Sequence, residues 1–362
     1  MPNFLAIDAG GTSTRAVFLN SSGHCLGYGT AGGGNPVSRG FRPALDALEE
    51  AAIKALGGAP KPFANALIAM AGASLELPAD LYRDRFLTLG LTKNVMIESD
   101  LLAAFYSGTF HDDGCALIAG TGAVAARIAE SRLAAVADGT GWLLGDSGSG
   151  FWLGREVAQA VASALDGRGP ATALTALVLG ELNIPLVMDA RTQGRLRAQQ
   201  QLISKVYERS PIELSHFAPM VFAVTDDPVA QDIVARAARA LARTLLAISG
   251  AAGQGPGKAS PQQSVGSQPA SVGAQPLVFG GSVLTRAEPL ASAVLDVLAA
   301  ESAARGAAQD KSIGLTARVD AFAPVLVHDG VVGSAVLVLK RNGIEVDETL
   351  FTRISESLAA LR

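Results

Sequence analysis

The stretch FLAIDAGGTSTRAVFL, residues 4–19, decides the fold. It reads as an apolar strand that ends in an acid, Asp8, followed by a turn at Gly10-Gly11 and a second apolar strand. The same order of strand, glycine turn and strand returns in CALIAGTGAVAARIA, residues 115–129, around Gly120-Thr121-Gly122. A β-hairpin that occurs twice indicates a duplicated unit. We therefore predict a chain built from two related α/β domains.

Hydrophobic periodicity predicts the other elements. The predicted strands lie at 66–70, 94–97 and 277–279, and the predicted helices at 42–57, from Leu101 onward, over much of 155–250 and around 350–358. These elements place an N-terminal domain at residues 1–112 and a C-terminal domain at 113–344, with the tail 345–362 packing back on the first domain.

Residues 251–276, AAGQGPGKASPQQSVGSQPASVGAQP, differ in composition from the rest of the chain. They are rich in Gly, Pro, Ser and Gln and carry a single charge, so they lack the apolar side chains of a core. We predict a flexible surface loop. Because the loop separates a predicted long helix from the strand at 277–279, it is an insertion within a domain and not a domain boundary.

The bulk composition argues against several classes of function. A chain of 362 residues, 49% of them hydrophobic, can bury two cores. The formal net charge of −4 and the lack of a Lys/Arg cluster argue against nucleic acid as a partner. No apolar run reaches the ~18 residues of a membrane span, and the N-terminus lacks the features of a signal peptide. We expect a cytoplasmic protein without a membrane partner.

The two cysteines, Cys25 and Cys115, lie far apart in the sequence and are expected to be free thiols in a reducing compartment. The four histidines show no metal-ligand spacing, which makes isolated core or surface histidines the expected case.

Three glycine-containing turns, each after an apolar strand, are candidate phosphate-binding sites. Phosphates need several backbone N–H groups that converge on one point, and glycines let the chain approach closely. None is a Walker loop, since no Gly-Lys-Ser/Thr follows, and the first turn leads into a strand and not into the helix of a dinucleotide fingerprint. One such turn is more often structural, but three in order favour phosphate binding. The candidate residues are Gly10, Gly11, Thr12 and Ser13, then Gly120, Thr121 and Gly122, then Gly280 and Gly281.

Two acids at strand ends are candidates for the chemistry. Asp8 follows the first strand and can hold Mg²⁺ directly or through water, or it can be a turn-forming Asp. Asp100 lies between a strand and a helix, where a carboxylate can accept the proton of a sugar hydroxyl. The alternative for Asp100 is an N-cap of the helix that begins at Leu101.

The segment GTGWLLGDSGSGFWLG, residues 139–154, holds both tryptophans and six glycines. Trp142 can offer an apolar face to a sugar ring, and Asp146 can bind hydroxyls. The alternative is a buried glycine-rich turn with core tryptophans. Asn35, at the tip of Gly-Gly-Gly-Asn35-Pro, can reach the same sugar or serve only as a turn residue.

Together these segments resemble the N-acetylglucosamine kinase and glucosamine kinase group of the superfamily that contains sugar kinases, heat-shock ATPases and actin. The resemblance covers most of the chain, and GTGWLLGDSGSGFWLGRE, residues 139–156, is its most specific block. The sequence of these segments is most similar to that of the actinobacterial glucosamine-kinase branch. The other resembling segments are IDAGGTSTRAVF, GGGNPVS, ESDLLAA, LIAGTGA, VFGGSV and HDGVVGSAVLVL.

The resemblance implies two ribonuclease-H-like (actin-like ATPase) domains, with ATP and Mg²⁺ at the base of an interdomain cleft and the sugar nearer its mouth. It implies that Asp100 is the catalytic base, that Asp8 lies near the metal, and that the first two glycine turns contact the phosphates. It also implies that Gly281 lies near the adenosine.

For the acceptor, the resemblance implies an amino sugar held by Asn35, Gly141 and Asp146 and phosphorylated on its 6-hydroxyl. The chain departs from the family pattern at Ser147, where relatives often have Glu, and at Ala123, where they often have Ser. Both departures lie on the sugar side, so N-acetylglucosamine stays an alternative. Free glucosamine is favoured, because its ammonium group matches a carboxylate such as that of Asp146.

Two other classes of function fit the sequence less well than the kinase. An activating ATPase of radical dehydratases uses cysteines to hold an iron–sulfur cluster, and two isolated cysteines do not match that motif. A non-catalytic regulator that binds sugar and ATP is argued against by the intact Asp8, Asp100 and glycine turns. A homodimer is compatible with the sequence, which does not determine the oligomeric state.

Overall fold

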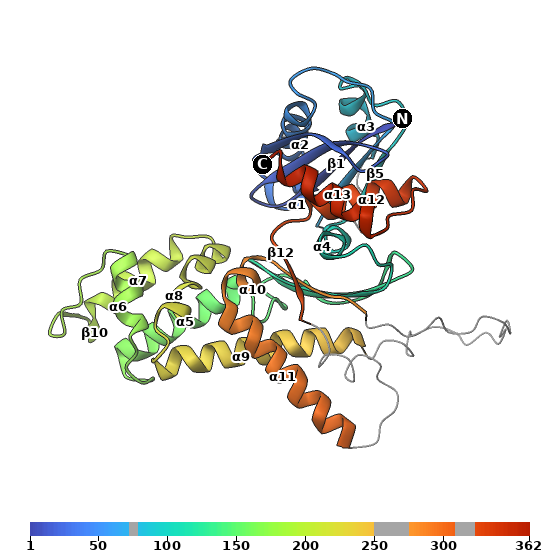
Figure 1. Ribbon diagram of the computed structural model, residues 1–362. Coiled ribbons are helices and arrows are strands. Elements are labelled where there is room, and N and C mark those ends of the chain that lie inside the picture. The colour runs from blue at the N-terminus through green and yellow to red at the C-terminus, as the bar shows by residue number, and fades with distance from the viewer. Residues whose placement is uncertain (72–78, 250–274, 308–322) are drawn as a thin grey trace, which may run out of the picture.

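The computed structural model describes residues 1–71, 79–249, 275–307 and 323–362. The predicted flexible loop 251–276 lies outside these residues apart from its last two residues. Within the described part, the chain forms two five-stranded sheets with helices against them, a mixed α/β fold as predicted (Figure 1).

The two sheets have the same topology. The first has the order β3-β2-β1-β4-β5 and the second the order β12-β11-β6-β7-β8. Each consists of an antiparallel three-stranded meander continued by two parallel strands. The strands of the first sheet are β1 (Asn3–Ala9), β2 (Thr14–Asn20), β3 (Cys25–Ala31), β4 (Asn65–Met70) and β5 (Val95–Ser99). Those of the second are β6 (Gly114–Ala119), β7 (Ala123–Ala129), β8 (Arg132–Asp138), β11 (Leu277–Gly280) and β12 (Val325–Val327).

The repeat predicted from the two hairpins is therefore confirmed, but its unit is longer than predicted. The third strand of each meander, β3 and β8, was not recognised in the sequence. In β3 the reason is the glycines, which favour turns over strands in sequence patterns. A Cβ added to Gly27 would lie 2.0 Å from the Ala55 carbonyl oxygen, so these glycines let a helix backbone come close to the strand.

Helices cover the sheets and fill the space between them. With the first sheet lie α1 (Pro36–Arg39), α2 (Phe41–Ala55), α3 (Ala79–Leu87) and α13 (Glu348–Ala359), and between the sheets lie α4 (Asp100–Gly108) and α12 (Val331–Arg341). The second half carries α5 (Gly150–Asp166), α6 (Leu174–Glu181), α7 (Arg197–Tyr207), a 3₁₀ helix (Pro211–Phe217), α8 (Met220–Ala223), α9 (Pro228–Ser249), α10 (Ser282–Arg286) and α11 (Glu288–Ala307), with a small hairpin of β9 (Arg191–Thr192) and β10 (Arg195–Leu196). None of the described helices is both long and apolar enough to cross a bilayer.

Both faces of β1 are buried, in agreement with its continuous apolar sequence. Leu5 and Ile7 belong to a core shared with α2 and α3. Phe4 and Ala6 point to the other face, into a core that includes α4, α12 and residues of the second sheet. One apolar core thus joins the two sheets through α4 and α12.

The chain returns to the first sheet at α12, which comes before the predicted tail at 345–362. Helix α12 packs against β1 and β4, and α13 follows it against β3, so both lie with the first sheet (Figure 1). Where α12 crosses α4, the backbones touch: a Cβ added to Gly333 would lie 1.8 Å from the Ala103 carbonyl oxygen. The Gly333 N–H donates to the Ser107 hydroxyl at 2.9 Å.

We predict that Gly333→Ala lowers the free energy of unfolding by about 1–3 kcal/mol, because the added methyl group forces α4 and α12 apart. The measurement is urea denaturation at equilibrium. Gly180→Ala in α6 is the matched control, since a Cβ there meets no atom within 4 Å. The control should be neutral or stabilising by up to about 1 kcal/mol. Equal stability of Gly333→Ala and the unmodified protein would contradict the close helix crossing.

Candidate active site

Asp8 and Asp100 come together at one cavity, although 92 residues separate them in the sequence. The cavity has a volume of about 140 Å³ and is also lined by Gly280, Gly281 and Asp329. Asp8 and Asp100 come from the first sheet and its following helix, and the glycines come from the end of β11 in the second sheet. A candidate metal ligand, a candidate base and a candidate phosphate turn therefore share one hollow.

Asp100 is the first residue of α4 and not its cap. The Ser99 hydroxyl accepts from the Leu101 N–H at 3.2 Å and fills the N-cap position, so the N-cap alternative for Asp100 is wrong. Burial raises the pKa of Asp100, against hydrogen bonding that lowers it. No ion pair holds its carboxylate within the described residues. This is the environment of a carboxylate that can take up a proton.

Asp8 lies one residue before the end of β1 and is held by the second half of the chain. Its Oδ2 accepts from the Gly330 N–H at 2.9 Å. Burial raises the pKa of Asp8 to about 6, with the Gly330 hydrogen bond opposing and the nearby Asp329 carboxylate adding to the rise.

The surroundings of Asp8 fit a magnesium ion. Gly330 has no Cβ, and one added there would lie 3.0 Å from Asp8 Oδ1, so the missing side chain leaves space beside that oxygen. Within the described residues, no group of three or more His, Cys, Asp or Glu side chains is placed to hold an ion. Mg²⁺ commonly takes one or two carboxylates and completes its shell with water and phosphate oxygens, which matches a single carboxylate here.

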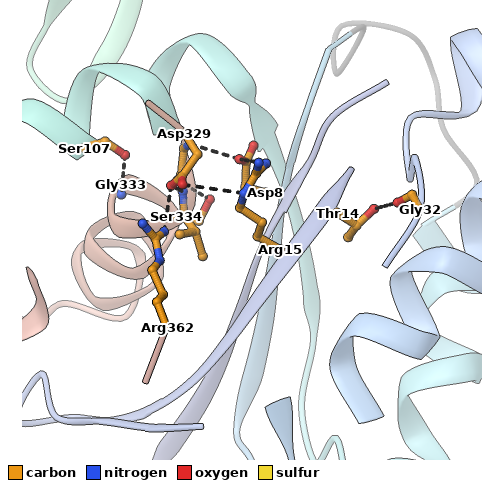
Figure 2. Close-up of polar contacts among 11 residues, drawn as sticks. Asp8, Thr14, Arg15, Gly32, Ser107, Asp329, Gly333, Ser334 and Arg362 are labelled. Atoms are coloured by element: carbon orange, nitrogen blue, oxygen red, sulfur yellow. Dashed lines mark hydrogen bonds and ion pairs between the residues drawn. The ribbon is translucent and has the colours of Figure 1, made fainter. Parts of the chain in front are cut away.

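A row of charges continues from Asp8, and the sequence analysis missed it. Arg15 Nη1 lies 3.9 Å from Asp8 Oδ2, and Arg15 Nε lies 3.5 Å from Asp329 Oδ2. Arg362 Nη2 lies 2.9 Å from Asp329 Oδ1 (Figure 2). Asp329 follows a strand and precedes a helix, as Asp100 does, and that shared pattern is the signal that could have found it.

The second and third glycine turns meet each other. A Cβ added to Gly281, whose φ is +83°, would lie 2.4 Å from the Ala119 carbonyl oxygen and 2.7 Å from the Gly120 nitrogen, so only glycine fits. The Gly120 carbonyl accepts from the Gly150 N–H at 2.7 Å, which seats the second turn on the N-terminus of α5. A cavity of about 530 Å³ is bordered by Gly120 and Thr121 of the second turn and by Ser282, which follows Gly281.

This larger cavity is mostly apolar behind the glycine turns. Its walls include Phe222, Val283 and Pro289, with Arg286 at the side. A flat apolar group with attached phosphates matches such a shape.

The first glycine turn packs against the GGGN segment. Gly34 N–H donates to the Gly10 carbonyl at 3.1 Å, and the Thr14 hydroxyl donates to the Gly32 carbonyl at 2.7 Å (Figure 2). Asn35 follows directly and is buried. The structure thus brings the predicted sugar residue Asn35 to the predicted phosphate turn Gly10–Ser13.

Asp146 supports the second glycine turn. It is buried, its Oδ1 accepts from the Ala123 N–H at 3.0 Å, and its carboxylate lies against Gly122. Burial raises the pKa of Asp146, while the Ala123 hydrogen bond lowers it. The backbone at Asp146 has φ 58°, and its N–H donates to Asp138 Oδ1 at 2.8 Å.

Trp142 and Gly141 lie on an exposed loop. The Trp142 side chain is 42% exposed and packs against Phe151 with 5.6 Å between ring centroids. The alternative that both tryptophans lie in a core is therefore wrong for Trp142. Leu143 and Leu144 beside it are 76% and 82% exposed. Several of the predicted site residues are not among the described residues that line the two cavities. They are Asn35, Gly141, Trp142, Asp146 and Gly10–Ser13.

Comparison with known proteins assigns the chain to a family. The profile of the BadF/BadG/BcrA/BcrD ATPase family matches residues 5–302, most of the chain. The chain is 29% identical over 255 residues to N-acetyl-D-glucosamine kinase of Dictyostelium discoideum, which covers 66% of this chain and 76% of the relative. It is 24% identical over 253 residues to glucosamine kinase GspK of Vibrio cholerae, covering 68% of this chain and 81% of the relative.

Solved structures share the fold. A candidate N-acetylglucosamine kinase from Porphyromonas gingivalis superposes with a TM-score of 0.61 at 19% identity, over 94% of this chain and 99% of that one. Another from Chromobacterium violaceum gives a TM-score of 0.59 at 21% identity, with the same coverage. The two-domain, actin-like ATPase architecture predicted from the sequence is confirmed.

We predict that Asp8→Asn stabilises the protein at pH 7.5 in the absence of nucleotide and Mg²⁺. The pKa of Asp8 is raised in the folded state from 3.8 to about 6, so the folded protein binds more protons than the unfolded chain between these values. The ionised carboxylate therefore costs free energy above pH 6, about 1–3 kcal/mol, and this cost disappears as the pH falls through that window. Asn removes the charge and keeps an oxygen for the Gly330 N–H.

Urea denaturation at pH 7.5 and pH 5 measures the effect, and the gain should be smaller at pH 5. Asp329→Asn is the matched comparison, because it weakens two ion pairs and should destabilise the protein. A lower stability of Asp8→Asn at pH 7.5 would contradict the burial cost of Asp8.

Proposed function

The chain belongs to the BadF/BadG/BcrA/BcrD ATPase family, and we propose that it is an ATP-dependent kinase of the 6-hydroxyl of an amino sugar. The observation that carries the proposal is the shared cavity of Asp8, Asp100 and the Gly280-Gly281 turn. Asp100 would be the base, Asp8 the metal carboxylate and Gly280-Gly281 a phosphate turn, and these are the parts that phosphoryl transfer needs. The named kinases among the relatives act on N-acetylglucosamine and glucosamine, which supports an amino sugar as the acceptor.

We assign ATP to the larger cavity. The adenosine would lie against Phe222 and Val283, close to Gly281, and the phosphates would run past Gly120–Gly122 toward Asp8. The turn Gly10–Ser13 would donate to the phosphates from the first sheet. Mg²⁺, when bound at Asp8, supplies a counter-charge for the β- and γ-phosphates.

Asp100 takes the proton of the attacking hydroxyl. Its raised pKa, caused by burial, makes it a stronger base than an ordinary aspartate. The glycine-turn N–H groups stabilise negative charge on the transferring phosphoryl group, and they need no reorganisation because backbone packing holds them.

The sugar would bind between the two domains, the first made of residues 1–112 with the returning helices α12 and α13, and the second of the remainder of residues 113–344. Asn35 would contact it from the first domain, and Gly141, Trp142 and Asp146 from the second. Trp142 is half-exposed and so is available to a sugar ring. Closure of the domains would bring the two sides together and exclude water, which otherwise competes as acceptor.

Glucosamine is favoured over N-acetylglucosamine as the acceptor. Asp146 Oδ1 is engaged by the Ala123 N–H, while Oδ2 has no hydrogen bond or ion pair within the described residues. An unengaged carboxylate oxygen on a largely buried side chain suits an ammonium group better than an acetamide.

The alternatives from other classes have less support. Cys25 and Cys115, the two cysteines of the chain, are both buried, one in each sheet, which does not suit an exposed cluster site of a dehydratase activator. A non-catalytic regulator has no need of a carboxylate with a raised pKa in the cavity of the phosphate turns. The cytoplasmic location and the homodimer stay predictions.

We predict that Asp100→Asn lowers kcat by about 10²–10⁴-fold, because the amide cannot accept the hydroxyl proton. The Kd of the sugar and the free energy of unfolding should change little. Stopped assays of ADP formation and calorimetric sugar binding measure the two effects. Glu98→Gln, two residues away and paired with Arg341, is the control and should keep most of the activity. Near-normal turnover of Asp100→Asn would rule out its role as the base.

We predict that ADP release with Mg·ATP is at least about tenfold more efficient for glucosamine than for N-acetylglucosamine, N-acetylmannosamine or glucose, the value of one charge-assisted contact. Asp146→Asn keeps an oxygen for the Ala123 N–H and should remove most of this preference. A preference for N-acetylglucosamine would keep the mechanism and reject the role of Asp146. No release with any of the four sugars would reject the amino-sugar acceptor.

A further inference from the structure

The charges around Asp329 link the candidate metal ligand to the last turn of the chain. Asp329 lies between two guanidinium groups, with Arg362 on Oδ1 at 2.9 Å and Arg15 on Oδ2 at 3.5 Å (Figure 2). Its side chain is 12% exposed, so both pairs are shielded from water on the Asp329 side. Both oxygens of Asp329 are thus engaged, Oδ1 by Arg362 and by the Val331 N–H at 3.2 Å, and Oδ2 by Arg15.

The position of Asp329 decides how Asp8 is held. The next residue, Gly330, donates its N–H to Asp8 Oδ2, and the space at Gly330 faces Asp8 Oδ1. A shift of the Asp329-Gly330 turn would therefore move the hydrogen bond that orients the Asp8 carboxylate. Arg15 also depends on this turn, because it is shared between Asp329 and Asp8.

Arg362 is itself fixed from two directions. Its guanidinium carbon lies 5.4 Å from the centre of the Tyr28 ring in β3, a cation–π distance. Helix α13, which precedes it, is tied to the same strand through the Ser357 hydroxyl, which accepts from the Cys25 N–H at 3.1 Å. Arg362 can therefore act as a fixed support for Asp329.

Without Arg362, Asp329 would keep Arg15 as its single ion-pair partner. The guanidinium group binds a carboxylate best through two parallel N–H bonds, so Arg15 would turn fully toward Asp329 and away from Asp8. The turn that carries Gly330 would then shift together with Asp329.

We propose that Arg362 is a positioning residue for the metal carboxylate: through Asp329 and Gly330 it holds Asp8 in the orientation that binds Mg²⁺. The inference rests on the proposed role of Asp8 in holding the metal of Mg·ATP. It adds a contribution from the end of α13 that lies outside the cavity itself.

The test measures metal binding directly and does not depend on turnover. Electron paramagnetic resonance counts free Mn²⁺ in the presence of the full-length protein and saturating ADP. We expect Arg362→Gln to weaken Mn²⁺ binding about threefold to tenfold, the range of a partly shielded ion pair. The Mn²⁺ affinity of Arg362→Lys should lie between those of Arg362→Gln and the unmodified protein. Lysine keeps the positive charge but cannot donate two parallel N–H bonds to the carboxylate.

Arg353→Gln is the matched control. Arg353 lies in α13, the helix that precedes Arg362, and donates to the Ser22 carbonyl at 2.8 Å, away from Asp329. It tests whether any loss of an α13 contact weakens metal binding. We expect Mn²⁺ affinity equal to that of the unmodified protein, and in steady-state assays of Arg362→Gln a raised KM for Mg²⁺ with an unchanged KM for the sugar.

A double-mutant cycle with Asp329→Asn separates the outcomes. If Arg362 acts through Asp329, the double variant binds Mn²⁺ no more weakly than Asp329→Asn alone. Unchanged Mn²⁺ affinity of Arg362→Gln, additive losses in the cycle, or an equal loss in Arg353→Gln would each overturn the inference. Absence of Mn²⁺ binding by the unmodified protein would overturn the metal role of Asp8 and this inference with it.

Discussion

The burial of one carboxylate, that of Asp8, at the junction of the two sheets is the constraint on which the site depends. An ionised group there loses its hydration and needs replacements from the protein. Gly330 and Arg15 supply them, one from the turn before α12 and one from β2. Meeting this need draws the end of the second sheet against the first, and it leaves the carboxylate with a pKa of about 6, close enough to neutrality for a cation to control its charge.

Close backbone contacts at glycines, with no side chain between the two segments, set the remaining geometry of the fold and the site. Gly281 touches Ala119 and Gly120 so closely that no Cβ fits, and Gly333 touches Ala103 in the same way. The first contact holds two glycine turns against each other, and the second holds the two helices between the sheets. Sites built from backbone are rigid, because packing and not rotamer choice positions their donors. A kinase that has no P-loop lysine depends on such rigidity for binding phosphate.

Local pattern predicted the elements that carry strong periodicity. The strands β1, β2, β4, β5, β6, β7 and β11 and the helices α2, α4 and α13 were expected within a few residues of their observed bounds, and α9 lies in the region 155–250 that was expected to be largely helical. Glycine-containing β3, alternating β8 and the mostly apolar α12 were not expected, because their patterns do not separate strand, turn and helix. Asp100 was found through its place between strand and helix. Arg15 was not, since a single arginine in an apolar strand has no partner that sequence spacing can identify.

The sequence by itself determined the repeat, the glycine turns and the acids at strand ends, because these depend on neighbours along the chain. The sequence also showed a family resemblance, which the match to the BadF/BadG/BcrA/BcrD ATPase family later supported. Only the tertiary structure decided which of these residues meet. It placed Asp8 beside Gly330 and set Arg362 on Asp329, contacts across more than 300 and across 33 residues. It also assigned the N-cap of α4 to Ser99 and not to Asp100. Burial and long-range pairing arise from packing the whole chain, and no local pattern encodes them.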